Sequence, residues 1–165
     1  MPDSREIVID TGPLIALIAA LGNLDVLKCL YSRVIIPFEV CREIQTDNST
    51  RFGVMEFTSA TWLEKRTSPI DLSPFLRNVL DPGEASVIQI AINEQIPFVA
   101  IDETFGRRIA RLHGLQLTGS LGILIKSKRH GYSIDISNAI RNMRNKGIWI
   151  NANLEAQIIK ETAKQ

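Results

Sequence analysis

The chain has few cysteines, few histidines and few aromatic residues, and it lacks a long apolar run. Its two cysteines form neither a C-x-x-C pair nor the Cys/His spacing of a zinc site, which argues against a disulfide framework and against a zinc ligand set. Cys29 and Cys41 lie in apolar helical patterns. We therefore expect both to be buried free thiols.

The longest apolar stretch, residues 13–21, is much shorter than the roughly 20 residues of a membrane span. The first residues show no basic segment followed by an apolar one, so we expect no secretory signal and a cytoplasmic location. Glycine-rich phosphate loops are also missing, since neither G-x-x-x-x-G-K nor G-x-G-x-x-G occurs. This absence weakens an interpretation as an α/β domain that binds small nucleotides.

With 165 residues, 45% hydrophobic and 22% charged, the composition is ordinary for a soluble globular protein, and the length suits one domain over residues 1–165. The net charge of +1 hides an uneven distribution. Residues 1–100 carry 8 Lys/Arg and 13 Asp/Glu, whereas residues 101–165 carry 11 and 5. A basic half can hold phosphates beside an acidic centre, although solvated helix faces explain the charges better when charge is considered alone.

Short apolar runs alternate with helical patterns along the chain. The runs predict buried parallel strands at residues 6–10, 34–36, 98–101 and 115–117, and a weaker edge strand at 62–66. Helices are expected at residues 13–20, 24–30, from 37 to about 44, 54–59, 73–80, 81–94, 103–113, 121–129, 136–146 and 154–163, with a loop at 46–52. This alternation predicts an α/β fold with a mainly parallel sheet between helices.

Four carboxylates stand where an apolar run ends or on a helix that opens near such an end: Asp10, Glu43, Glu84 and Asp102. Ligand sites in open parallel sheets lie beyond the carboxyl ends of the strands, where the sequence places Asp10 and Asp102. Glu43 and Glu84 lie on helices that can face the same edge. Because a cluster of unpaired carboxylates needs protons or divalent cations to share the site, the pattern indicates a metal site.

Some of these residues also have purely structural explanations. Asp102 can cap the helix that it precedes, and Asp81-x-x-Glu84 has the form of a capping box, in which Glu84 reaches back to a backbone N–H. His113 and His130 each precede a glycine at an expected helix end, where an imidazole suits the helix dipole. For the histidines we therefore expect a structural role rather than catalysis.

The other two acids are harder to explain by local structure. Asp10 follows a buried strand and precedes a sharp turn, a position with few purely structural analogues. Glu43 has a rival in Glu39, which lies four residues earlier on the same helix face. Because the helix dipole already explains an acid in the first turn, Glu43 is the better ligand candidate.

Five segments occur in a recognisable order: Ile7–Ile15, Ile36–Ile44, Asp81–Ala85, Ile101–Glu103 and Thr118–Gly122. These segments resemble the ordered motifs of PIN-domain proteins, and in particular a prokaryotic PIN-like subfamily of nucleic-acid-binding proteins related to VapC toxins. The resemblance extends from about Ile7 to Ala163, which is nearly the whole chain.

The resemblance implies a PIN-like three-layer α/β/α sandwich with a mainly parallel central sheet of about four to five strands. It further implies a metal-dependent endoribonuclease that cleaves RNA phosphodiester bonds. In such an enzyme, Mg²⁺ or Mn²⁺ would be bound by four acids, which together with the metal activate a water molecule: Asp10, Glu43, Glu84 and Asp102. A toxin of a toxin-antitoxin pair, with a small antitoxin protein as its partner, is implied as well. The alternative is a non-catalytic PIN-like module that binds nucleic acid or a protein.

Candidate contacts to nucleic acid are Thr11, Arg107, Arg108, Thr118 and Ser120. The two arginines follow Asp102 on one expected helix and can meet an RNA backbone, although surface residues flanking a core are an equally good explanation. Thr118 and Ser120 have no nearby His and Asp in a triad-like pattern, which argues against a role as a catalytic nucleophile. The resemblance implies instead that they contact phosphate or a metal-bound water.

The chain departs from the family pattern in two places. Many PIN domains carry another acid two positions beyond the one matched by Asp102, where this chain has Thr104, and Glu103 is expected to point elsewhere if it is helical. A second metal ion is therefore not implied. Gly12 replaces the Ser or Asn of many relatives, which removes a contact near the metal.

Self-association is also expected. Relatives commonly form homodimers, and apolar residues on a late helix give a face that one sheet does not fully cover. The residues of this face are Ile136, Ile140 and Met143.

Overall fold

A computed structural model of the protein describes residues 5–46 and 50–163. Within these residues the strands form a five-stranded sheet in the order β3-β2-β1-β4-β5, and all neighbouring strands are parallel. The strands are β1 (Glu6–Ile9), β2 (Arg33–Ile36), β3 (Glu64–Lys65), β4 (Phe98–Ala100) and β5 (Gln116–Thr118). The helices are α1 (Thr11–Leu21), α2 (Val26–Leu30), α3 (Phe38–Gln45), α4 (Val54–Ser59), α5 (Pro74–Val79), α6 (Pro82–Asn93), α7 (Thr104–Leu112), α8 (Ser120–Arg129), α9 (Ile136–Asn145) and α10 (Ala152–Ala163).

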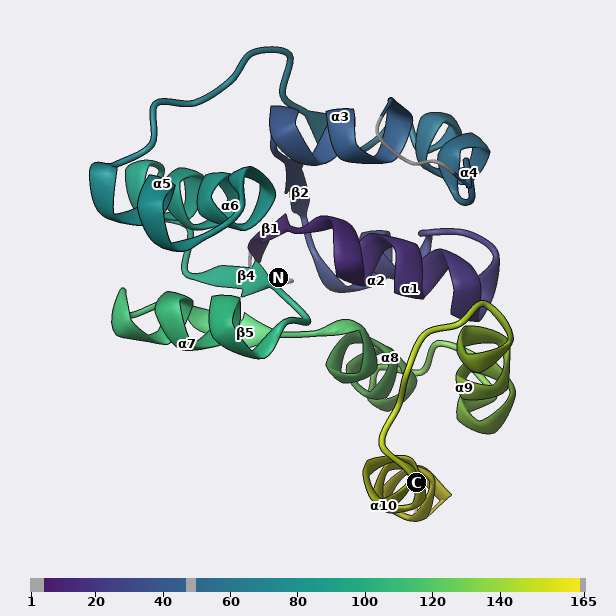
Figure 1. Ribbon diagram of the computed structural model, residues 1–165. Helices are drawn as coiled ribbons and strands as arrows, with labels where there is room; N and C mark the ends of the chain where they lie inside the picture. Colours follow the sequence, from purple (N-terminus) through teal and green to yellow (C-terminus); the bar gives the residue numbers. More distant parts are fainter. Residues whose placement is uncertain (1–4, 47–49, 164–165) are drawn as a thin grey trace.

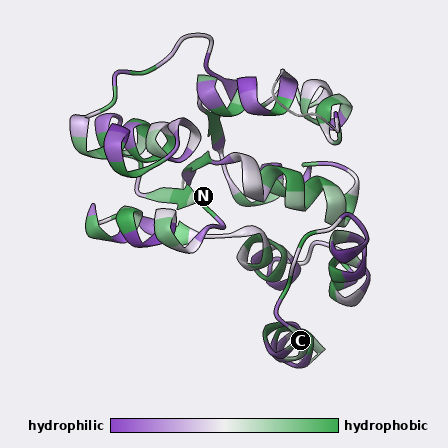
Figure 2. Cartoon of the chain, in the orientation of Figure 1, coloured by the Kyte–Doolittle hydropathy of each residue, from purple (hydrophilic) through white to green (hydrophobic). Residues whose placement is uncertain are grey.

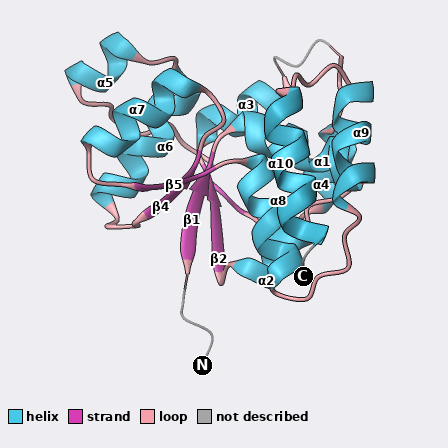
Figure 3. Cartoon of the chain, turned by 90° about the horizontal axis from the view of Figure 1, so that it is seen from below, coloured by secondary structure: helices cyan, strands magenta, loops and turns pink. Residues whose placement is uncertain are grey.

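The sheet lies between two groups of helices (Figure 3). Helices α5, α6 and α7 lie on one side, and α6 packs against β1 and β4. Helices α1, α2, α8 and α9 lie on the other side, where α1 contacts both α8 and α9 (Figure 1). This arrangement confirms the predicted α/β/α sandwich with a parallel sheet. None of the described helices has the length and apolar character needed to cross a membrane.

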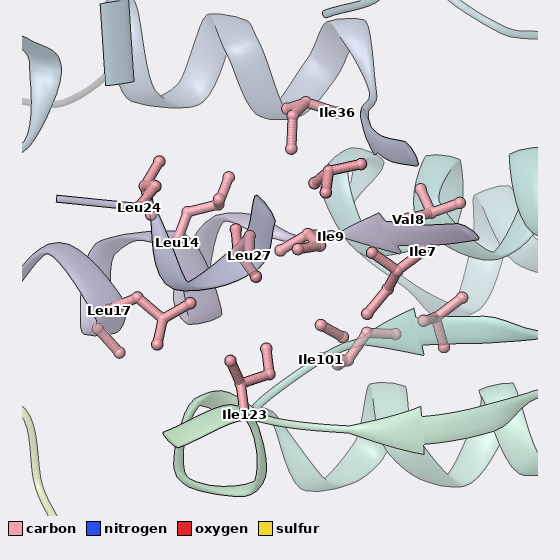
Figure 4. Close-up of a cluster of buried hydrophobic side chains, with 14 of the residues drawn as sticks. Ile7, Val8, Ile9, Leu14, Leu17, Leu24, Leu27, Ile36, Ile101 and Ile123 are labelled. Atoms are coloured by element: carbon pink, nitrogen blue, oxygen red, sulfur yellow. The ribbon is translucent and has the colours of Figure 1, made fainter. Parts of the chain in front are cut away.

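The central strand explains why the first apolar run is so uniform. β1 has a strand on each side and helices on both faces, and Ile7, Val8 and Ile9 are each 0% exposed. A strand buried on both faces needs a continuous apolar run rather than an alternating one. Figure 4 shows these three side chains among the leucines and isoleucines of the core, and Figure 2 shows that α1 is predominantly hydrophobic along its length.

Most expected elements are present with ends shifted by one or two residues. The expected edge strand at 62–66 is reduced to β3, at the end of the sheet. Helix α1 begins directly after β1, so that Asp10 occupies its N-cap position. Residues 47–49 of the expected loop lie outside the described residues.

Both histidines close helices, as predicted. His113 and His130 are the C-cap residues of α7 and α8. In each case Nδ1 lies within hydrogen-bond distance of the carbonyl four residues earlier, at 2.9 Å from Ile109 and 2.8 Å from Lys126. Because a carbonyl only accepts, we assign the proton to Nδ1 in both rings.

The prediction for Cys29 was wrong, whereas Cys41 is a buried free thiol as expected. Cys29 is exposed because the short helix α2 turns Val26, Leu27 and Leu30 towards the core and leaves the intervening positions on its outer face.

The expectation that α9 has an uncovered apolar face for self-association was also wrong. Ile136, Ile140 and Met143 are 3%, 0% and 1% exposed, because α9 packs this face against α1 of the same chain. The amide nitrogen of Asn142 also donates to the Ala20 carbonyl at 3.1 Å and holds the two helices together. This face is therefore part of the core and is not available to a second copy.

Candidate metal centre

Two acids follow neighbouring strands at the same edge of the sheet. β1 and β4 are parallel, with Ile9 opposite Ala100, and the Asp10 backbone N–H donates to the Ala100 carbonyl at 3.0 Å. Asp10 follows β1 directly, and Asp102 follows β4 after one intervening residue. Both acids therefore stand beyond the carboxyl ends of adjacent strands, where ligands bind in such sheets.

Helices α3 and α6 bring further acids to this edge. Glu43 lies on α3, which follows β2, and Asp81 is the N-cap residue of α6, which packs against β1 and β4. A Cβ added at Gly83 would meet three carboxylate oxygens at 3.1–3.4 Å. These are Glu43 Oε2, Asp10 Oδ1 and Asp81 Oδ1. Oxygens from three separate segments thus surround one point, and glycine at 83 leaves that space open.

A cavity of about 380 Å³ lies among these acids. Its lining includes the four acids expected from the sequence, two further acids and a few small or apolar residues: Asp10, Glu43, Glu84, Asp102, Asp81, Glu103, Thr11, Gly12, Ile15, Ala16 and Ile148. Among the described residues no lysine, arginine or histidine lines this cavity. The site is therefore electronegative, and its acids repel one another.

Burial and repulsion raise the pKa of two of the acids. Asp10 is 7% exposed, and burial, together with the charges of Asp81 and its other acidic neighbours, raises its pKa to about 7, while the Thr11 backbone N–H acts in the opposite direction. Glu84 is 6% exposed, and burial, followed by the charge of Asp81, raises its pKa to about 8. A cation that binds here therefore has to displace protons.

Asp81 and Glu84 form only half of the expected capping box. The Asp81 carboxylate accepts a hydrogen bond from the Glu84 backbone N–H at 2.9 Å and so caps α6. The reciprocal capping-box bond, from the Asp81 backbone N–H to the Glu84 carboxylate, is not found among the described residues, and Glu84 Oε1 is buried there without a hydrogen-bond partner. This oxygen lies 2.7 Å from the position that a Cβ at Gly106 would take. Capping therefore explains why Asp81 stands at the start of α6. It does not explain why Glu84 is buried, although burying an unpaired carboxylate costs free energy of folding.

Asp102 is held by the start of α8 and not by α7. Its Oδ1 accepts from the Ser120 backbone N–H at 2.8 Å, and its Oδ2 accepts from the Ser120 hydroxyl at 3.0 Å. A Cβ added at Gly119 would lie 2.7 Å from Asp102 Oδ1, so the loop approaches the acid closely because residue 119 is glycine. The capping role considered for Asp102 was wrong, because the N-cap residue of α7 is Glu103.

Two of the candidate nucleic-acid contacts form hydrogen bonds with the acids. Thr11 lines the acidic cavity, where its hydroxyl donates to Glu43 Oε2 at 2.9 Å. Ser120 is 5% exposed and donates both of its hydrogen bonds to Asp102. Both side chains therefore position carboxylates.

The remaining candidates lie beside the acids. Arg107 is half-buried, and its Nη1 donates to the carbonyls of Ile101 at 2.7 Å and of Thr118 at 3.1 Å, which ties the ends of β4 and β5 together. Thr118 and Arg107 line a second hollow next to the acidic cavity. Arg108 is exposed on α7 and lines neither hollow.

Three residues of the cavity were missed from the sequence. Asp81 was considered only as a cap. Glu103 was expected to point elsewhere, but α7 begins one residue later, and Glu103 has an extended backbone (φ −75°, ψ 134°) and lines the cavity. Ile148 comes from the segment between α9 and α10, and no local sequence pattern links that segment to the site.

The donor set fits a hard divalent cation, because every ionisable group in the lining is a carboxylate. Although three carboxylates approach the Gly83 position, no group of three or more His, Cys, Asp or Glu side chains within the described residues is arranged so that it could hold a metal ion on its own. Mg²⁺ does not require such a cage, since it keeps several of its waters and is commonly held by one or two carboxylates. The orphaned Glu84 oxygen and the open space at Gly83 are consistent with a site that is completed by a ligand.

Comparisons with known proteins identify the family of the chain. A family model described as a PIN domain matches residues 6–164, from β1 to the end of α10. No curated protein and no solved structure matches the chain. PIN domains have a nuclease-type fold and typically use divalent metals. Because the match covers nearly all of the sequence, the chain belongs to the PIN-domain family.

Proposed function

We propose that the protein is a single-domain, metal-dependent endoribonuclease with Asp10, Glu43, Glu84 and Asp102 as its catalytic and metal-binding residues. The observation that carries this proposal is that all four acids line one cavity at the carboxyl edge of the sheet. Among the described residues, no cysteine and no histidine lines the cavity, which argues against a thiol nucleophile or an imidazole base. Carboxylates that bind a cation are the remaining chemistry.

The acids and the residues that donate hydrogen bonds to them would have separate roles in binding the metal ion. Asp10 and Asp102 would hold Mg²⁺ or Mn²⁺ between neighbouring strand ends, while Ser120 keeps the Asp102 carboxylate oriented. Thr11 orients Glu43 in the same way. Bound metal supplies a water of lowered pKa and offsets the negative charge that develops on the phosphate. The pKa values of Asp10 and Glu84, raised to about 7 and 8 in the metal-free protein, mean that both carboxyl groups would release protons as they bind the cation.

A cleavage assay tests the proposal. Single-stranded RNA labelled at one end should be cut internally in the presence of Mg²⁺ or Mn²⁺ and should stay intact in EDTA. Asp10→Asn should abolish cleavage while the protein stays folded, and Asp71→Asn, which changes an exposed acid outside the cavity, should cut normally. Cleavage that persists in EDTA or in Asp10→Asn would contradict the assignment.

The toxin role is a finer part of the same proposal and rests on the resemblance to VapC toxins. Expression of the wild-type chain should then arrest bacterial growth, Asp10→Asn should not, and a small antitoxin protein should restore growth. A homodimer also belongs to this part of the proposal, but the α9 face is buried and does not supply the interface. If RNA binds but is not cut with any divalent metal, the non-catalytic binding module is the better description.

A further inference from the structure

A second hollow, of about 930 Å³, lies beside the acidic cavity. The two share Asp102, Glu103 and Ile148, so one continues into the other. The start of α7, the β5–α8 connection and the segment between α9 and α10 form its walls. We call this second hollow the side groove. A chain lying in it would pass directly over the acids.

Two aromatic side chains line the side groove but remain open to solvent. Trp149 is 82% exposed and Phe105 is 51% exposed. They come from different elements, since Phe105 is on α7 and Trp149 precedes α10. Large aromatic surfaces are costly to leave in water. Their position in one groove therefore indicates a ligand with flat apolar faces.

The segment that carries Trp149 is fixed to the body of the protein. The Arg144 guanidinium donates to the Ile150 carbonyl at 3.1 Å and forms an ion pair with Glu155. Ile148 is half-buried and Ile150 is 7% exposed, so the residues on both sides of Trp149 pack inward. Figure 1 shows this segment running past α8 to α10. The exposure of the indole is thus a consequence of an anchored backbone.

The polar surroundings favour nucleic acid over a hydrophobic protein segment. The lining of the side groove includes Thr104, Thr118 and Asn151 beside its apolar residues, so hydrogen-bonding groups lie close to the aromatic rings. Arg107 also lines it, together with the carboxylates of Asp102 and Glu103, and Arg108 is exposed on the same helix outside the groove. Aromatic faces beside basic side chains are the combination that binds unpaired bases together with their phosphates.

We propose that Trp149 and Phe105 form a base-stacking subsite that holds an unpaired nucleobase next to the acidic cavity. This inference rests on the proposed function and deepens it. It assigns to the chain a pair of residues that selects RNA with unpaired bases. Stacking requires a base whose face is free, so the subsite discriminates against duplexes. Trp149 and Phe105 act in binding and contact no reacting atom.

Binding in EDTA tests the subsite without any cleavage. In a Trp62→Phe background, Trp149 is the sole tryptophan, so its fluorescence reports on the groove alone. A short single-stranded oligoadenylate should quench this fluorescence, and an abasic oligomer of equal length and charge should quench it much less. In the otherwise wild-type chain, Trp149→Ala should weaken oligoadenylate binding by about 5- to 150-fold, the range for loss of one stacking contact.

Controls separate stacking from other effects. Trp149→Phe should restore most of the affinity, and Met55→Ala, which truncates an equally exposed apolar side chain on α4, should leave it unchanged. Trp149→Ala should not change the affinity for the abasic oligomer. If Trp149→Ala binds oligoadenylate as tightly as the parent, the subsite is excluded. If the substitution instead alters the oligomeric mass, the subsite is also excluded and the rings belong to a protein interface. These outcomes do not depend on cleavage, so the nuclease assignment can fail separately.

Discussion

The carboxylate of Asp102 receives both hydrogen bonds that Ser120 can donate, one from the backbone N–H at 2.8 Å and one from the hydroxyl at 3.0 Å. The two residues follow adjacent strands, β4 and β5, so the second strand supports the acid that follows the first. Groups that orient a ligand carboxylate commonly affect metal binding nearly as much as the ligand itself.

Ser120→Ala should separate positioning from ligation. The backbone bond remains, but Asp102 loses its second donor and gains rotational freedom. We expect divalent-cation affinity to fall about 10- to 100-fold, as for other residues that support metal ligands, with a loss of stability of about 1–3 kcal/mol. Calorimetric titration with Mn²⁺ and thermal melts measure the two effects. An unchanged Mn²⁺ affinity would show that Asp102 needs no such support.

Glu84→Gln distinguishes a ligand from a cap. The change keeps the helix start intact, because Asp81 supplies the capping bond to the backbone of residue 84. It also removes a buried, repelled carboxylate, and the new amide can donate to Asp81. The melting temperature of the metal-free protein should therefore stay level or rise, while metal affinity and RNA cleavage fall steeply. Undiminished cleavage at saturating Mn²⁺ would remove Glu84 from the site.

The metal-free protein should lose stability as the pH rises. The pKa of Asp10 lies near 4 in the unfolded chain and about 7 in the folded protein. Between these values the folded state binds more protons, so the free energy of unfolding falls with increasing pH, by about 2–4 kcal/mol in total. Glu84, raised to about 8, extends the fall towards that pH.

Thermal melts in EDTA from pH 5 to pH 8 measure this slope, and Asp10→Asn should flatten it. Mg²⁺ should restore stability at pH 8, because the cation binds the deprotonated acids. A melting temperature that increases over this range in EDTA would contradict the buried acidic cluster.

Two glycines near Asp102 provide a matched pair. A Cβ at Gly119 would lie 2.7 Å from Asp102 Oδ1 and 3.1 Å from Arg107 Nη1, whereas a Cβ at Gly12 would lie no closer than 3.7 Å to Asp102. Gly119→Ala should therefore displace the carboxylate, destabilise the protein by about 1–3 kcal/mol and reduce cleavage. Gly12→Ala should leave stability near the wild-type value and should not displace Asp102. Equal behaviour of the two variants would contradict the close approach at Gly119.

The sheet and the acids that follow it could be predicted because they leave local signals. A strand buried on both faces is a continuous apolar run, as in Ile7 to Ile9, and an acid immediately after such a run falls at the carboxyl edge whatever the rest of the chain does. The same reasoning placed Asp102. The structure adds that Glu43 and Glu84 line the same cavity, which depends on helix packing.

Other parts of the site depend on details that a single sequence does not contain. Glu103 was missed because a one-residue shift in the start of α7 turns it from a helical residue into an extended one beside the cavity. Ile148 and Trp149 lie in a connection without periodicity, so their position depends on how α9 and α10 pack. The apolar pattern of Ile136 and Ile140 indicates burial, but it cannot distinguish α1 from a second chain as the partner.

The order of strands in the sheet also determines when the acids can meet during synthesis. β1 leaves the ribosome first, yet it occupies the middle of the sheet, and its neighbour β4 begins at Phe98. Asp10 has to wait for Asp102, and Asp102 is fixed only when Ser120 has been made. A nascent chain therefore completes its acidic centre only after Ser120 has been made. For a protein that we propose cuts RNA, we therefore expect a nascent chain that has not reached Ser120 to lack an ordered metal site.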